Sequence, residues 1–159
     1  MDYEKAKQIG ESVLEKLKPC LEKGAIAGSI RRGKKTVNDI DLVLLPKGEF
    51  MVLESIKSVL LSYGKLGVDG TQIVRVKDQD GVKIDCYIAT KQNYEVLLLI
   101  RTGSKEHNIK LAQEALRQGK QLKFSEGLLD KKTGKLLANT EESIFKELGL
   151  EYVEPEKRN

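Results

Sequence analysis

The chain has 159 residues, of which 40% are hydrophobic and 33% charged, and its formal net charge is +4. This composition is too apolar for a disordered chain, and a protein of this length can bury a core without disulfides or structural metals. The longest apolar run, Val96-Leu97-Leu98-Leu99-Ile100, is much shorter than the roughly 18 residues that cross a bilayer, and the N-terminus has no apolar leader. We therefore expect a soluble, cytoplasmic protein that does not enter a membrane.

The first ninety residues alternate between helical and extended patterns. The predicted elements are a helix over 2–18, a strand over 25–27 that runs into Gly28-Ser29, a strand over 40–45, a helix over 50–63, and two strands over 71–76 and 82–89 joined by Asp80-Gly81. Apolar residues at helical spacing mark the helices, alternation marks the strands, and the Asp-Gly pair favours a hairpin turn. These elements predict a compact lobe with a mixed or antiparallel sheet and helices.

The pattern changes after Thr90. Helices are predicted over 93–101 and 104–118, then short strands over 121–124, 128–129 and 135–137, and a last helix over 140–148 that Gly149 ends. We therefore expect an α+β protein with two domains, 1–92 and 93–159. The segment 101–136 holds nine Lys or Arg against four Asp or Glu, which favours a face that meets phosphates.

Three aspartates form the most informative pattern. Asp39 and Asp41 flank one apolar residue at the start of a buried strand, so both side chains project from one face. Two adjacent carboxylates repel each other unless a cation or a proton lies between them, which indicates divalent metal binding. Asp85 lies on another predicted strand and shares one face of it with Lys83. If the two strands are neighbours, three carboxylates can hold two Mg²⁺ ions, with Mn²⁺ as a substitute, for phosphoryl or nucleotidyl transfer.

A glycine-serine turn precedes the aspartates. Gly28 permits close backbone approach, and the Ser29 hydroxyl with the following amides can bind phosphate oxygens. The cations near this turn are Arg31, Arg32, Lys34 and Lys35. The two cysteines, Cys20 and Cys86, have no partner at metal-ligand spacing, and we expect free thiols.

These residues resemble the palm signature of family X DNA polymerases, the DNA polymerase beta group. The similar motifs are Gly28-Ser29-x-Arg31-Arg32-Gly33 with Asp39-x-Asp41, then Thr102-Gly103-Ser104 with Asn108, and a closing Glu154-Pro155-x-x-Arg158. The resemblance runs from about Ile26 to Arg158. It implies a nucleotidyltransferase palm followed by a small thumb lobe.

The resemblance also implies a function and the residues that perform it. The chain would be a monomeric, template-directed polymerase that adds dNTPs to a primer 3′-hydroxyl on gapped DNA in repair. Metal binding and catalysis would fall to Asp39, Asp41 and Asp85; nucleotide binding to Gly28, Ser29, Arg32, Thr102, Gly103, Ser104 and Asn108; and DNA binding to Lys105, Lys110, Arg117 and Lys120. Lys83 stands where the family usually has an arginine that bonds the third aspartate.

The sequence also departs from the family pattern. Ile100 and Arg101 replace two aromatic residues before Thr102, which alters the surface that discriminates the sugar. The 25 residues before Ile26 supply one helix, so we expect no lyase domain, no lyase activity and no fingers. Two other activities remain open: untemplated terminal transfer, and a minimal antitoxin-like nucleotidyltransferase that modifies protein or RNA. A non-enzymatic nucleic-acid-binding module is also compatible with the fold, although all three aspartates are present.

Overall fold

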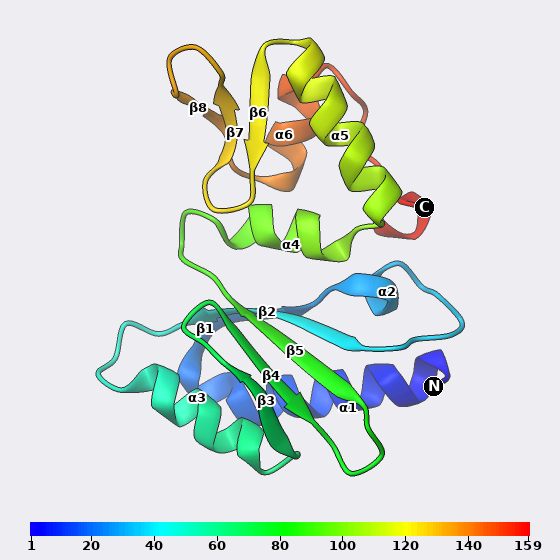
Figure 1. Ribbon diagram of the computed structural model, residues 1–159, viewed down its shortest axis with the longest axis vertical. Coiled ribbons are helices and arrows are strands. Elements are labelled where there is room, and N and C mark those ends of the chain that lie inside the picture. Colours follow the sequence, from blue (N-terminus) through cyan, green and yellow to red (C-terminus); the bar gives the residue numbers. More distant parts are fainter.

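A computed structural model describes all 159 residues, which form two lobes stacked along the long axis with one helix between them (Figure 1). The first lobe, the palm, contains α1 (Tyr3–Leu17), a 3₁₀ turn (Lys18–Cys20), β1 (Leu21–Ile26), α2 (Gly28–Arg31), β2 (Ile40–Pro46), α3 (Val52–Leu61), β3 (Lys65–Asp69), β4 (Ile73–Lys77) and β5 (Lys83–Ile88). The second lobe, the thumb, contains α4 (Tyr94–Thr102), α5 (Lys105–Arg117), β6 (Lys120–Lys123), β7 (Gly127–Asp130), β8 (Leu136–Ala138), α6 (Glu141–Glu147) and a 3₁₀ turn (Pro155–Lys157). The α+β class is confirmed.

The palm sheet has the strand order β1-β2-β5-β4-β3. Only β2 and β5 run parallel, and the other neighbours are antiparallel, so the sheet is mixed as predicted. The predicted hairpin of β4 and β5 is confirmed. The sequence analysis missed β3, an edge strand with an exposed burial pattern and a bulge opposite β4. Because this strand buries little apolar surface, it lacks the alternation that reveals other strands.

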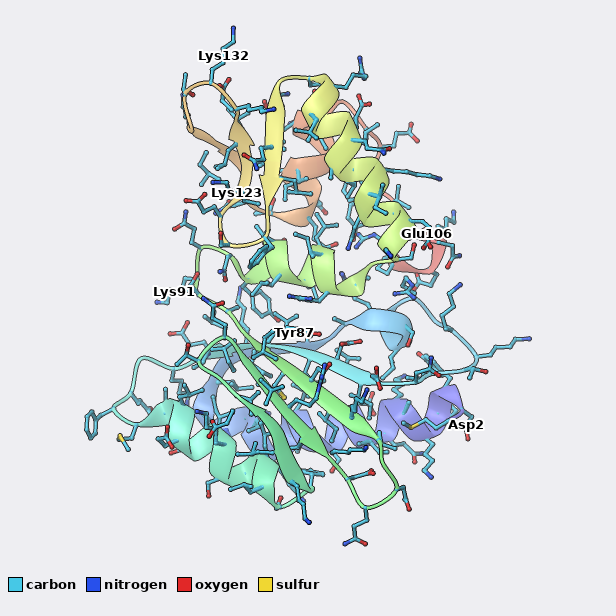
Figure 2. All side chains as sticks on the ribbon, viewed as in Figure 1. Asp2, Tyr87, Lys91, Glu106, Lys123 and Lys132 are labelled. Carbon is cyan, nitrogen blue, oxygen red and sulfur yellow. The ribbon has the colours of Figure 1, made fainter.

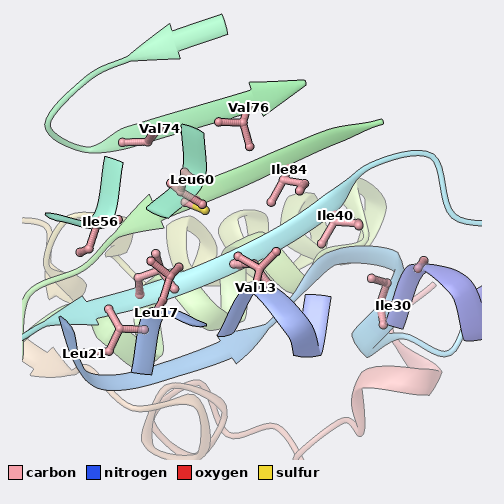
Figure 3. Packing of buried hydrophobic residues seen from close by; sticks show 14 of the residues in the cluster. Val13, Leu17, Leu21, Ile30, Ile40, Ile56, Leu60, Val74, Val76 and Ile84 are labelled. Atoms are coloured by element: carbon pink, nitrogen blue, oxygen red, sulfur yellow. The ribbon is translucent and has the colours of Figure 1, made fainter. Parts of the chain in front are cut away.

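One face of the palm sheet packs against α1 and α3 to form the larger core (Figures 1 and 3). Val13 and Leu17 of α1 and Ile56 of α3 belong to one buried cluster with Ile40 and Ile84 of the two central strands. Each of these side chains stabilises the fold by about 1.5–3 kcal/mol when fully buried. The odd-numbered residues of β2 point to the opposite face, toward the thumb, and this strand is therefore apolar on both sides.

The thumb has its own core around the small sheet β6-β7-β8. Leu111 of α5, Leu128 of β7 and Phe145 of α6 are buried in it. Helix α6 begins with a capping box, in which Thr140 and Ser143 each accept the other's backbone N–H. It ends as predicted at Gly149, whose positive φ of 70° lets its amide bond the Lys146 carbonyl.

Helix α4 contributes to two clusters of buried side chains. Its Val96 and Leu99 pack in the thumb, while Leu97 joins a third cluster with Val43 and Ala89 of the palm. The helix thus joins the lobes through apolar contacts on two faces. The division into units of 1–92 and 93–159 stays a prediction.

A buried ionic cluster makes a second connection between the lobes. Glu141 of α6 accepts from Arg31 of the palm at 2.5 Å and from Arg158 near the C-terminus at 2.6 Å. Arg31 also donates to the Thr102 hydroxyl at 2.8 Å. Arg158 is fully buried, with its guanidinium over the rings of Phe145 and Tyr152. A buried cation is costly without an ionic partner. Glu141 therefore holds the C-terminal segment, through Arg158, and the palm, through Arg31, in one arrangement.

Cys20 and Cys86 are both free, and burial raises the pKa of the Cys86 thiol to about 12. No helix is long and apolar enough to span a bilayer.

Candidate active site

An open cleft of about 930 Å³ lies between the palm and the thumb. The palm contributes Gly28, Ser29, Arg32, Lys34, Lys35, Asp39, Asp41 and Tyr87 to its lining, and the thumb contributes Ile100, Arg101, Gly103, Lys105 and Asn108. The lining therefore combines two carboxylates with several cations. Eight of the site residues predicted from the sequence line the cleft, whereas Asp85, Thr102 and Ser104 do not.

The sheet register brings Asp41 and Asp85 together. They are direct partners in the parallel pairing of β2 and β5, so their side chains project side by side from the face toward the thumb. Asp39 precedes Asp41 by two residues and adds its charge to the same region. The expected neighbourhood of the aspartate-bearing strands is confirmed.

The surroundings of Asp41 disfavour its charged form. Burial, together with the charge of Asp85 and to a smaller extent that of Asp39, raises the pKa of Asp41 to about 6, while a hydrogen bond from Tyr87 opposes the shift. Hard divalent cations prefer carboxylate oxygens, and a cation beside Asp41 would remove the repulsion. The chemical type of these residues therefore fits a divalent metal.

As they stand, however, the carboxylates are engaged with other side chains. No group of three or more His, Cys, Asp or Glu side chains is arranged to hold an ion. Both oxygens of Asp85 are bonded to an arginine, and Oδ1 of Asp41 accepts from the Tyr87 hydroxyl at 3.3 Å. The three aspartates that the sequence predicts as a cluster thus occupy neighbouring positions in the fold. Metal binding would require their side chains to rotate away from their present partners.

The partner of Asp85 is Arg75, and the expected contact from Lys83 is absent. Arg75 lies directly opposite Asp85 on β4 and donates from Nε and Nη2 at 2.5 and 2.7 Å. Lys83 shares the face of Asp85 but forms no hydrogen bond or ion pair with it. A planar guanidinium can bond both carboxylate oxygens, which an ammonium group cannot do with the same geometry. The sequence analysis missed Arg75 because only cross-strand pairing reveals it.

The raised pKa of Asp41 leads to a testable pH dependence. The carboxyl titrates near 3.8 in its reference state and near 6 in the folded protein. Between these values the folded state binds more protons, so stability falls as pH rises through this window. Asp41→Asn should therefore raise the metal-free stability at pH 7, by up to about 3 kcal/mol, and lose this advantage near pH 4.

Chemical denaturation in EDTA at several pH values measures this difference. His107 has its pKa lowered to about 4 by burial, which makes stability rise with pH over part of the same range. That contribution is common to both proteins and cancels in the difference. Asp80→Asn, at the exposed β4–β5 turn, is the matched control. If the stability of Asp41→Asn changes with pH in parallel with that of the unmodified protein, the pKa of Asp41 is not raised in the folded state.

Gly28 is required by its contact with Asp41. It has a φ of +61°, and a Cβ at this position would overlap Oδ2 of Asp41. The next residue, Ser29, lines the cleft in the first turn of α2. The glycine-serine turn therefore lies directly beside the acidic strands, as the sequence predicted.

Gly28→Ala should disturb both the backbone and the aspartate. A non-glycine residue at this φ costs about 1 kcal/mol, and the added methyl would also push the Asp41 carboxylate away. We expect a lower free energy of unfolding in chemical denaturation, because the backbone strain and the displaced carboxylate both disfavour the folded state. Gly48→Ala is the control, because no atom lies within 4 Å of a Cβ there and its φ is ordinary. A Gly28→Ala protein as stable as the unmodified protein would show that the close approach is dispensable.

Two arginines follow the serine and have different contacts. Arg31 bonds Glu141 and Thr102 and does not line the cleft. Arg32 lines the cleft, donates from Nη1 to the Thr102 carbonyl, and has a buried Nε with no partner. Of the pair, only Arg32 thus lines the cleft, and its predicted contact with a nucleotide stays a prediction.

The thumb residues divide between the cleft and the framework. Gly103 and Asn108 line the cleft, and the Asn108 amide donates to the Ile100 carbonyl at 2.8 Å while its buried Oδ1 has no partner. Thr102 is fully buried, and its hydroxyl bonds the Leu98 carbonyl and Arg31. Ser104 caps α5 by accepting from the His107 amide. The side chains of Thr102 and Ser104 therefore form hydrogen bonds within the protein and do not face the cleft. Their predicted contact with a nucleotide stays a prediction.

The four basic residues predicted to bind DNA occupy different environments. Lys105 lines the cleft at the start of α5, and Lys110 is exposed further along this helix. Arg117 is paired with Glu114, and Lys120 donates to Gln118 and to the Glu147 carbonyl. Lys105 and Lys110 are thus the two without an internal ionic partner.

Comparisons with known proteins agree with this architecture. The family model of the DNA polymerase beta thumb matches residues 97–159. The DNA nucleotidylexotransferase of Gallus gallus is 29% identical over 176 residues, which cover 84% of this chain and 35% of that protein. The DNA polymerase/3′-5′ exonuclease PolX of Bacillus subtilis (strain 168) is 29% identical over 139 residues, covering 83% of this chain and 23% of that protein.

The chain therefore spans about a third or less of the length of these curated relatives. Among solved structures, polymerase beta of Leishmania infantum in a ternary P/T complex superimposes with a TM-score of 0.85 at 20% identity, over 100% of this chain and 76% of the other. This superposition shows a shared fold that includes both lobes. The chain is therefore similar to the DNA polymerase beta thumb over residues 97–159, and over its whole length it shares the fold of a solved polymerase beta.

Proposed function

We propose that the chain adds nucleotides from dNTPs to the 3′-hydroxyl of a DNA primer by two-metal nucleotidyl transfer. The observation that carries this proposal is the register of Asp41 opposite Asp85, because Asp41 also lines a cleft together with Gly28, Ser29 and several cations. Carboxylates serve metal ions and cations serve phosphates, so one cleft offers both halves of the chemistry. The DNA polymerase beta thumb supports DNA as the partner over protein or RNA.

The residues of the cleft would divide the work between them. Asp39 and Asp41 would hold two Mg²⁺ ions together with Asp85, and bound Mg²⁺ supplies charge stabilisation for the attacking and leaving oxygens. Asp85, once turned from Arg75, would orient the primer 3′-hydroxyl and accept its proton. Ser29 and Arg32 would hold the triphosphate. Gly103 and Asn108 would line the side of the cleft where the sugar and base lie.

We infer that addition is directed by a template, with short gaps in DNA as the natural substrate. Untemplated addition is the second candidate, because DNA nucleotidylexotransferases are prominent among the relatives. The two activities share the chemistry of the cleft and differ only in whether the template base selects the nucleotide. A monomer satisfies the proposal, since both lobes of one chain form the cleft.

The decisive experiment incubates the purified chain with a labelled primer and Mg²⁺ or Mn²⁺. Each dNTP is supplied separately, on single-stranded, primed and one-nucleotide-gapped DNA. Extension only by the complementary nucleotide supports templated polymerisation, and extension of the single strand by any nucleotide supports terminal transfer. No extension of any DNA by a protein that binds Mn²⁺ contradicts the proposal and favours another acceptor.

DNA binding in this proposal depends on phosphate contacts from exposed lysines. Each phosphate neutralised releases counterions, so affinity for primed DNA should fall steeply as salt increases. Lys105 and Lys110 are the residues expected to contribute to this slope, since Arg117 and Lys120 are paired internally.

A further inference from the structure

The Tyr87 hydroxyl is hydrogen-bonded to Asp41, a carboxylate of the proposed metal site. Tyr87 follows Asp85 by two residues on β5, so its side chain leaves the sheet on the same face. Its hydroxyl donates to Oδ1 of Asp41 at 3.3 Å. Figure 2 shows Tyr87 between the palm sheet and α4. An oxygen that accepts this hydrogen bond has one lone pair fewer for a cation.

Arg101, in the last turn of α4, covers Tyr87 from the thumb side. Its guanidinium carbon lies 4.1 Å from the centroid of the Tyr87 ring, a close cation–π contact. Its buried Nε has no hydrogen-bond partner, although guanidinium groups normally use such donors. Arg101 also lies near enough to Asp41 to act on it as a favourable charge. The acidic side chain is thus compensated by a hydroxyl and a cation of the protein itself.

Space is available for this pair to move. Tyr87 and Arg101 line the main cleft and also a second cavity of about 300 Å³ beside it. This cavity extends from Ile73 of β4 to Phe124 after β6, and it is bounded by hydroxyl and amide groups that include Asn93. The two side chains therefore lie between the main cleft and the second cavity. Rotation of the Arg101 side chain would move its guanidinium group from one space into the other.

We propose that Tyr87 and Arg101 form an internal counterion pair for Asp41, which occupies the carboxylate until a divalent cation displaces it. This inference depends on the proposed function, because it assumes that Asp41 binds the cation. The pair would stabilise the metal-free protein at the expense of metal affinity. The Tyr87 hydroxyl withholds Oδ1, and the Arg101 charge opposes the approach of a second cation.

A purely structural role for the pair leads to the opposite expectation. If Tyr87 and Arg101 only support the fold around Asp41, removing either group loosens the site and lowers metal affinity or leaves it unchanged. If they compete with the metal, removing either group raises metal affinity while lowering metal-free stability. The direction of the change in affinity therefore separates the two roles.

The test measures Mn²⁺ binding to the full chain by electron paramagnetic resonance, without nucleotide or DNA. Tyr87→Phe removes only the hydroxyl and should tighten binding about two- to tenfold, the range of one net hydrogen bond. Arg101→Met removes the charge and should tighten binding by about tenfold. Arg101→Lys retains the charge and should stay closer to the unmodified protein. Lys132→Met, on the exposed β7–β8 turn, is the control for net charge and should not change affinity.

Tyrosine absorbance reports whether a cation displaces the Tyr87 hydroxyl from Asp41. The chain has five tyrosines and no tryptophan, so loss of the Tyr87 hydrogen bond should give a tyrosine difference spectrum when Mg²⁺ is added. The signal should be absent from Tyr87→Phe, and that variant should unfold at a lower temperature in EDTA.

Equal or weaker Mn²⁺ binding by both Tyr87→Phe and Arg101→Met overturns the counterion pair while the proposed function stands. If the unmodified protein and both variants bind no Mn²⁺, the metal site itself is wrong, and this inference fails with it.

Discussion

Asp85→Asn should reduce nucleotide addition by at least about a thousandfold while the protein still folds. The substitution removes the charge that would meet the metal and accept the primer proton, and it keeps the shape of the side chain. Losing several kcal/mol of charge stabilisation corresponds to a rate loss of this size. Single-turnover primer extension measures it, with saturating dNTP and metal.

The same substitution also affects Arg75, whose two hydrogen bonds to Asp85 would lose their ionic acceptor. Arg75 is partly exposed and can reach water, so we expect only a modest change in stability. Asp80→Asn, on the hairpin that carries Asp85, is the control for removing one negative charge and should keep normal activity. An Asp85→Asn protein that extends primers at a normal rate would remove Asp85 from the catalytic group.

Glu141→Gln should produce the largest loss of stability of any single substitution considered for this chain. Arg158 is fully buried, and Glu141 is its ionic partner. Removing one member of a buried pair leaves an uncompensated charge and costs about 3–5 kcal/mol. Arg31 would lose its link to the thumb at the same time. The free energy of unfolding from urea denaturation measures the effect.

Glu142→Gln is the matched control, since the neighbouring side chain is exposed and should change stability by less than about 0.5 kcal/mol. If the two variants unfold at the same urea concentration, the cluster does not hold the lobes together. Because Arg32 follows Arg31 directly and donates to the Thr102 carbonyl, we also expect Glu141→Gln to weaken nucleotide binding.

Local patterns were sufficient to identify most elements of this protein. The helix over 2–18 appears as α1, and the strand over 40–45 appears as β2, because apolar periodicity reports directly which face an element buries. The exposed strand β3 carries no such signal. The short motif around Gly28 and Asp41 also indicated its chemistry, since the residues lie within one strand-turn-strand unit.

Contacts between distant segments could not be read from the chain. Arg75 meets Asp85 through antiparallel pairing, Glu141 joins Arg31 to Arg158, and Arg101 reaches Tyr87 across the two lobes. The sequence by itself determined the α+β class, the acidic pair and the glycine-serine turn, because these depend on neighbours a few residues apart. Only the tertiary structure decided which side chain compensates each buried charge, because that choice depends on strand register and on how the thumb packs against the palm.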